Sequence, residues 1–155
     1  MPARSSSFAF LEGALDRAEH LRDDPAALAA LWAQGRVLRL DDDGRAPVDA
    51  EGTLLSVPGS ASGALPAQAV FLGLRGGEGW FALSAAAAGG DAPHVDLRTA
   101  AATWPAFEAT AHAQARAVLH WRARHRCCGA CGGALAFSRG GWLGRCAACD
   151  IEHYP

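Results

Sequence analysis

The sequence contains no lysine, because all 14 of its basic residues are arginine. This absence excludes a P-loop, which needs a lysine before its Ser or Thr, and any Schiff-base chemistry. No run of 18 uninterrupted apolar residues occurs either, which argues against a membrane-spanning helix. Val and Ile together number only seven, and 36 of the 78 apolar residues are Ala. We therefore expect a modest core built from Leu, Phe and Trp.

The N-terminal residues argue against a secretory leader. The first seven residues carry one Arg but no long apolar run follows, and Glu12, Asp16 and Glu19 come soon after. All five cysteines lie between 127 and 149, whereas a disulfide-framed secreted domain would spread them along the chain. Clustered cysteines in a reducing compartment indicate a metal site. We expect a cytoplasmic protein with no membrane partner.

Charge divides the chain into two unequal parts. Residues 1–109 carry 8 Arg and 14 Asp or Glu, a net of −6, and residues 110–155 carry 6 Arg and 2 acids, a net of +4; together they give −2. Such an asymmetry indicates a boundary near residues 110–125. We place it so that one domain covers 1–122 and a second covers 123–155.

The first part is expected to mix helices and strands. Asp24 and Pro25 are a typical helix start, the following residues are strong helix formers, and Gly35 is the expected left-handed stop. Residues 1–7 are expected to fray, and a short helix is possible within 8–22. Strands are expected at 36–40, 53–57, 70–74 and 80–83, with a hairpin turn at 75–79 and loops at 58–66 and 85–95.

Motifs that would support independent catalysis are weak. A divalent-metal site at Asp41 to Asp43 is one interpretation, but a solvated turn ending in Gly44 is the better one. The run 77–79 lacks the third glycine of a dinucleotide loop, and 59–63 has Ala61 where a nucleophile elbow needs Ser. We assign no catalytic and no cofactor-binding residue.

A longer helix is expected from about Pro105 to Arg122, capped by Thr103 or Trp104. Apolar positions recur there at spacings of four and three, with Arg116 and His120 off the stripe. The stripe consists of Phe107, Ala111, Gln114, Val118 and Trp121.

Two C-x2-C pairs follow this helix. Cys128 with Cys131, and Cys146 with Cys149, are separated by 14 residues. Each pair can form a tight turn that directs two sulfurs at one centre, and four thiolates complete a tetrahedron around zinc. Such a closed site is structural, since no position remains for a water. We expect Gly132 to adopt a positive φ and Asp150 to stand in the matching place. Free redox thiols are the alternative.

Three residues near the pairs are given other roles. Competition of Cys127 with Cys128 for the metal is one interpretation, but a small buried apolar residue is the better one. His125 is expected at the helix C-terminus rather than on the metal. His153 is expected on the surface or on an edge strand.

The residues around the cysteines resemble the zinc ribbon of NADH pyrophosphatases, in the Nudix hydrolase superfamily. The resemblance rests on Trp121 to Gly133, on Gly141-Trp142 and on Cys146 to Pro155. Residues 15–22 and 71–83 are similar to the rudimentary Nudix-like N-terminal domain of that family. The resemblance implies an α+β fold, in which a small mixed α/β Nudix-like domain is followed by a C-terminal zinc ribbon. It also implies that the zinc ligands are Cys128, Cys131, Cys146 and Cys149.

The resemblance also implies a parent activity. The family hydrolyses NAD(H) to NMN(H) and AMP with Mg or Mn, related members remove NAD caps from RNA, and the parent enzymes are homodimers. Cys127 stands where the family has an aromatic residue. The catalytic Nudix domain would follow Pro155, and the six Glu residues include no adjacent pair and no Arg-Glu dipeptide. We therefore expect an accessory portion that is inactive alone.

A nucleic-acid or protein binding module is the alternative function. Zinc ribbons often contact nucleic acid, and Trp142 could stack on a base. Six arginines make the C-terminal region basic, and the alternative role for them is to balance the charge of the thiolates. They are Arg116, Arg122, Arg124, Arg126, Arg139 and Arg145.

Overall fold

The computed structural model describes residues 15–85 and 91–155. The expected frayed segment 1–7, the first part of the possible helix 8–22 and part of the expected loop 85–95 lie outside these residues. Within 15–22 the chain forms a 3-10 helix, η1 (Glu19–Leu21).

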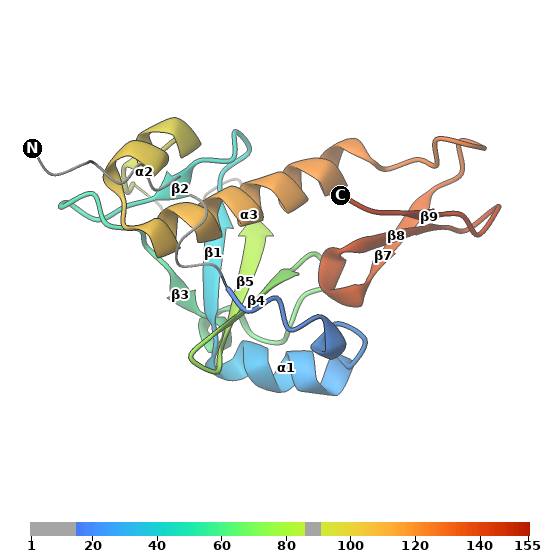
Figure 1. The fold of residues 1–155 in the computed structure, drawn as a ribbon, viewed down its shortest axis with the longest axis horizontal. Coiled ribbons are helices and arrows are strands. Elements are labelled where there is room, and N and C mark those ends of the chain that lie inside the picture. Colours follow the sequence, from blue (N-terminus) through green and yellow to red (C-terminus); the bar gives the residue numbers. More distant parts are fainter. Residues whose placement is uncertain (1–14, 86–90) are drawn as a thin grey trace, which may run out of the picture.

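A four-stranded mixed sheet organises the first part of the chain (Figure 1). Its strand order is β3-β1-β5-β4. β1 and β5 pair in parallel, while β4 with β5 and β3 with β1 pair in antiparallel fashion. The strands are β1 (Arg36–Leu40), β3 (Val57–Pro58), β4 (Val70–Arg75) and β5 (Glu78–Ser84). The expected hairpin between β4 and β5 is confirmed, and Gly76 and Gly77 in its turn have positive φ.

Helix α1 (Pro25–Gln34) covers one face of this sheet. The Asp24 carboxylate accepts from the backbone N–H groups of Ala26 and Ala27, which confirms the expected cap. Leu28 and Trp32 are buried with Phe71 and Phe81 of the strands. The left-handed conformation expected at Gly35, directly after this helix, is wrong. Gly35 is extended, with φ −89°, and is needed for space: a Cβ there would lie 2.4 Å from the Gly79 carbonyl oxygen.

Helix α3 (Ala106–Arg124) covers the opposite face. Pro105 stands at its N-cap, rather than Thr103 or Trp104 as expected. The expected apolar stripe is buried at all positions except Gln114, whose side-chain amide donates to the Leu72 carbonyl. Residues 38, 72 and 80 on the strands point to this helix, while their neighbours 37, 71 and 81 point to α1, as strand alternation requires.

Several short elements differ from the sequence prediction. The expected strand 53–57 is reduced to β3 and one bridge from Leu54 to Val48, which closes a turn where the Asp49 carboxylate accepts from the Thr53 N–H. The ladder of β2 (Ala46–Pro47) with β6 (His94–Val95) was not expected, nor was α2 (Leu97–Thr103), which Asp96 caps. A second 3-10 helix, η2 (Gly59–Ser62), lies in the expected loop 58–66.

A separate three-stranded antiparallel sheet forms the C-terminal part (Figure 1). It consists of β7 (Leu135–Ser138), β8 (Leu143–Cys146) and β9 (Glu152–His153), with the turn η3 (Arg139–Gly141) joining the first two. The Trp142 indole N–H donates to the Phe71 carbonyl at 2.7 Å and ties this sheet to β4. The architecture is the expected α+β fold. None of the described helices combines the length and apolar character needed to span a bilayer.

Candidate metal centre

The four cysteines of the two C-x2-C pairs converge on one point. The ligand atoms of Cys128, Cys131, Cys146 and Cys149 all lie within 4.8 Å of one another. Three of the separations between sulfurs are 3.4, 3.5 and 3.6 Å. Four thiolates at about 2.3 Å from zinc would stand about 3.8 Å apart, so the cluster has the size of a tetrahedral zinc site.

The backbone turns around the cysteines explain why the sulfurs meet. Gly132 and Asp150 each stand four residues after the first cysteine of their pair, with φ of 75° and 62°, which confirms the expected matching positions. Their N–H groups bond back to the carbonyls of Cys128 and Cys146. A Cβ on Gly133 would lie 3.0 Å from the Cys146 sulfur, so only glycine lets the backbone pass this close.

Backbone donors around the sulfurs favour their ionised form. The N–H groups of Ala130, Gly133 and Ala148 each point at a cysteine sulfur at 3.4 Å. The Ala130 N–H is the largest influence on Cys128 and lowers the pKa of that thiol to about 6. A thiolate is the form that binds zinc. The cluster therefore fits a structural zinc ion, and four protein ligands leave no coordination position for a catalytic water.

Neighbouring residues occupy mostly the expected places. His125 follows α3 and its ring Nδ1 lies 3.0 Å from the Trp121 carbonyl. His153 is on the edge strand β9, with its Nε2 3.3 Å from the Cys128 sulfur. The buried position expected for Cys127 is wrong: its side chain is exposed, while its backbone forms an isolated bridge to Ala134.

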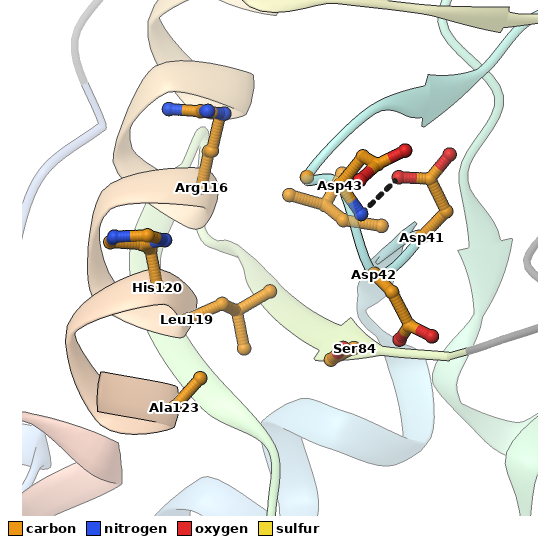
Figure 2. Close-up of a pocket in the computed structure, with 10 residues that line it drawn as sticks. Asp41, Asp42, Asp43, Ser84, Arg116, Leu119, His120 and Ala123 are labelled. Atoms are coloured by element: carbon orange, nitrogen blue, oxygen red, sulfur yellow. Dashed lines mark hydrogen bonds between the residues drawn. The ribbon is translucent and has the colours of Figure 1, made fainter. Parts of the chain in front are cut away.

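The acidic run forms the expected turn, beside a small pocket of about 80 Å³. The Asp41 carboxylate accepts from the backbone N–H groups of Asp43 and Arg45 and so serves the turn itself. Figure 2 shows Arg116 and His120 of α3 across the pocket from this turn. Among the described residues, the four cysteines are the group whose ligand atoms converge closely enough for a metal.

Three of the six C-terminal arginines bond to the protein itself. Arg139 pairs with Asp23 at 3.0 Å, and Arg145 pairs with Asp150 and Glu152. The Arg122 guanidinium donates to the Gln68 carbonyl at 2.9 Å. The Trp142 ring is half-buried against Arg22, which leaves it poorly placed to stack on a base.

Two buried polar residues were missed by the sequence reasoning. Arg22 is only 9% exposed and lies with its guanidinium over the Trp142 ring, 4.3 Å from the ring centre. His112 is fully buried in α3, with Nε2 2.9 Å from the Gly44 carbonyl. Arg22 ends the segment 15–22 that resembles the family, and His112 stands in no motif. Their partners lie 120 and 68 positions away, so no local pattern could have revealed their contacts.

Comparison with known families supports both parts of the chain. The model described as NADH pyrophosphatase-like rudimentary NUDIX domain matches residues 15–121. The model described as NADH pyrophosphatase zinc ribbon domain matches residues 123–154. A comparison with curated proteins found no match.

Proposed function

This chain belongs to the family of the NADH pyrophosphatase-like rudimentary NUDIX domain, and we propose that it forms the accessory portion of an NAD(H) diphosphatase. The observation that carries the proposal is the consecutive match of the two family models over 15–121 and 123–154. In the parent reaction, water attacks the pyrophosphate of NAD(H) and gives NMN(H) and AMP. The domain boundary that we propose lies at 122–123.

The described residues supply scaffolding rather than chemistry in this proposal. Zinc on the four cysteines would fix the ribbon, and Trp142 would hold the ribbon against β4. Pyrophosphate hydrolysis in this family uses Mg or Mn, which hard carboxylate oxygens prefer, whereas the four sulfurs suit zinc. We propose that those ions and the catalytic carboxylates belong to a Nudix domain of the parent enzyme, and that residues 1–155 are inactive alone.

Three further features belong to the same proposal. We propose a cytoplasmic location because the clustered cysteines suit a reducing compartment. We propose a homodimer of the parent enzyme, on the family resemblance. A nucleic-acid or protein binding module is the second candidate function, favoured by the net charge of +4 in residues 110–155.

The accessory role is tested first at the gene. The nucleotide sequence after the Pro155 codon, together with the intact mass of the native protein, should show an in-frame continuation into a Glu-rich Nudix box. A stop codon with no such box nearby would contradict the accessory role. Sedimentation velocity of the native protein should show a dimer, and a monomer at all concentrations would contradict the proposed homodimer.

Inactivity of residues 1–155 is tested by assay. The zinc-loaded chain is incubated with NADH and Mg or Mn, and AMP is measured by chromatography. We expect no AMP above the blank. AMP formation in proportion to the protein, lost with the Mg or Mn, would overturn the inactivity.

A further inference from the structure

Arg22 is a buried cation at the junction between the first part of the chain and the ribbon. It follows η1, it is 9% exposed, and the Trp142 ring covers one face of its guanidinium. Burial is the main influence on its pKa, which lies below the ordinary value. An arginine nevertheless stays charged at neutral pH, so the junction contains a desolvated positive charge.

One edge of this guanidinium has no hydrogen-bond partner. Nε and Nη2 of Arg22 are both shielded from solvent and both unpartnered within residues 15–85 and 91–155. The adjacent acid, Asp23, is already paired with Arg139 through both carboxylate oxygens. Nε and Nη2 present two parallel N–H groups, the arrangement that binds a carboxylate with two hydrogen bonds. An unpaired buried charge is costly, so a ligand that supplies the missing acceptors gains free energy.

A pocket of about 270 Å³ adjoins this side chain. It lies between α1, the loop before β4 and the turn η3 of the ribbon, and most of its wall is apolar. Among the described residues that line it, Arg22 and Arg139 are the charged ones and none is acidic. Gly140 forms part of the wall, and a Cβ there would lie 3.0 Å from the Phe71 Cβ and 3.8 Å from the Arg22 Cγ. The wall therefore suits an apolar body with one negative charge.

We propose that this junction pocket binds a small apolar carboxylate, with its two oxygens on Nε and Nη2 of Arg22 and its apolar body against Leu28, Phe71 and Phe137. Since that edge is shielded from solvent, the Arg22 side chain must turn on binding to bring Nε and Nη2 to the pocket. A carboxylate fits better than a phosphate, because a single charge is less costly to bring into an apolar pocket. Since the ribbon supplies part of the wall, binding depends on the zinc-held fold. The proposal does not rest on the diphosphatase role.

The test uses 4-phenylbutyrate as the probe and the zinc-loaded full chain as the protein. Titration calorimetry should show binding of the carboxylate at least about tenfold tighter than of 4-phenylbutanamide, the gain of about one charge-assisted hydrogen bond. The Nε–H resonance of Arg22 in ¹⁵N-labelled protein should move during the titration. This second measurement needs no variant. Equal affinity for the amide, an unmoved Arg22 resonance, or tighter binding of inorganic phosphate would each overturn the proposal.

Variants separate the pocket from general surface charge. Arg22→Met keeps the length and apolar stem of the side chain and should lose the preference for the carboxylate over the amide. Arg36→Gln is the matched control, since Arg36 lies on β1, pairs with Glu78 and does not line the pocket. A preference that survives in Arg22→Met, or that Arg36→Gln removes equally, contradicts the assignment.

Discussion

At position 112 a histidine is fully buried with one ring nitrogen hydrogen-bonded and the other not. Its Nε2 faces the Gly44 carbonyl, an acceptor, so Nε2 must carry the proton. Nδ1 has no partner among the described residues. The neutral ring suits this arrangement, because a proton on Nδ1 would be a buried donor without an acceptor. Desolvation accordingly holds the pKa of His112 below its ordinary value. The hydrogen bond to Gly44 raises this pKa and the charge of Arg116 lowers it, and both effects are smaller than that of desolvation.

Stability should therefore fall in mild acid. A histidine whose pKa is lowered in the folded state binds its proton more readily when unfolded. The free energy of unfolding that neutral His112 contributes is fully present above the pKa of the unfolded state, about 6.5. It is lost as the pH falls from that value toward the lower pKa of the folded state. We expect His112→Gln, which keeps a donor for Gly44 but cannot titrate, to show a smaller fall. Urea unfolding from pH 7.5 to 5 measures this, and an equal fall in both proteins would contradict it.

Gly59 lies against the end of α1, where a side chain has no room. A Cβ there would lie 2.0 Å from the Trp32 carbonyl oxygen and 2.9 Å from its carbon, both backbone atoms. The backbone cannot yield as a flexible side chain would, so Gly59→Ala should lower the free energy of unfolding by about 1–3 kcal/mol. Gly129→Ala is the control, because nothing lies within 4 Å of its Cβ position. Urea unfolding followed by circular dichroism checks both, and equal stabilities would contradict the steric reason.

The same residues show what local sequence can and cannot predict. The Asp24 cap, Gly132 and Asp150 were predicted, because each role is decided by neighbours within four residues. The conformation of Gly35 and the exposure of Cys127 were not. Gly35 lies where the Gly79 carbonyl, 44 positions away, leaves no room for a Cβ, and the burial of a thiol depends on how the ribbon packs.

At the scale of elements, strong periodicity was a sound guide and short pairings were not. The helices 25–34 and 106–124 and the strands 36–40, 70–75 and 78–84 follow from apolar spacing and turn residues. β2 and β6 have two residues each and are stabilised by partners 47 and 49 positions away, so no pattern predicts them. For the metal site the pairs themselves were sufficient, since a C-x2-C turn brings its own sulfurs together.

The folding of the ribbon should depend on zinc. Cys128→Ser or Cys149→Ser should lose zinc and unfold the chain from about residue 124, while the far-UV signal of residues 1–110 survives. Metal supplies about 10–16 kcal/mol of apparent folding free energy in small zinc domains. Loss of the Trp142 contacts with Phe71 and Arg22 should also weaken the first part by about 1–3 kcal/mol.

Cys127→Ser is the matched control for the zinc prediction. Its side chain is exposed and it is outside the cluster of four sulfurs, so zinc content and folding should be retained. Elemental analysis and circular dichroism measure both quantities. If Cys127→Ser lost zinc as Cys128→Ser does, or if both ligand variants kept it, the four-thiolate assignment would be wrong.

Over the whole molecule, the uneven charge is reduced by contacts between distant residues. Of the six arginines in residues 110–155, Arg139 pairs with Asp23 across the junction and Arg145 pairs within the ribbon. Arg122 donates to the loop before β4 and covers Phe137. The remaining three are spread from α3 to the start of the ribbon. The net +4 already counts the two acids that pair with Arg145, so the Arg139–Asp23 pair is the contact that lowers it, to +3 (4 − 1). The bonds of Arg122 and Arg145 hold their guanidinium groups against the protein, which leaves fewer of the six free to meet a phosphate backbone.

Binding of RNA should accordingly be weak. Affinity for a phosphate backbone grows with the number of phosphates neutralised, and few contacts give little binding and a shallow dependence on salt. We expect no measurable binding of a single-stranded RNA to the zinc-loaded chain at about 50 mM salt. Fluorescence anisotropy of a labelled oligonucleotide measures this, with the double variant Arg124→Ala and Arg126→Ala as the control. Strong binding that declines steeply with salt and disappears in that variant would contradict the expectation and favour the nucleic-acid module over the accessory role.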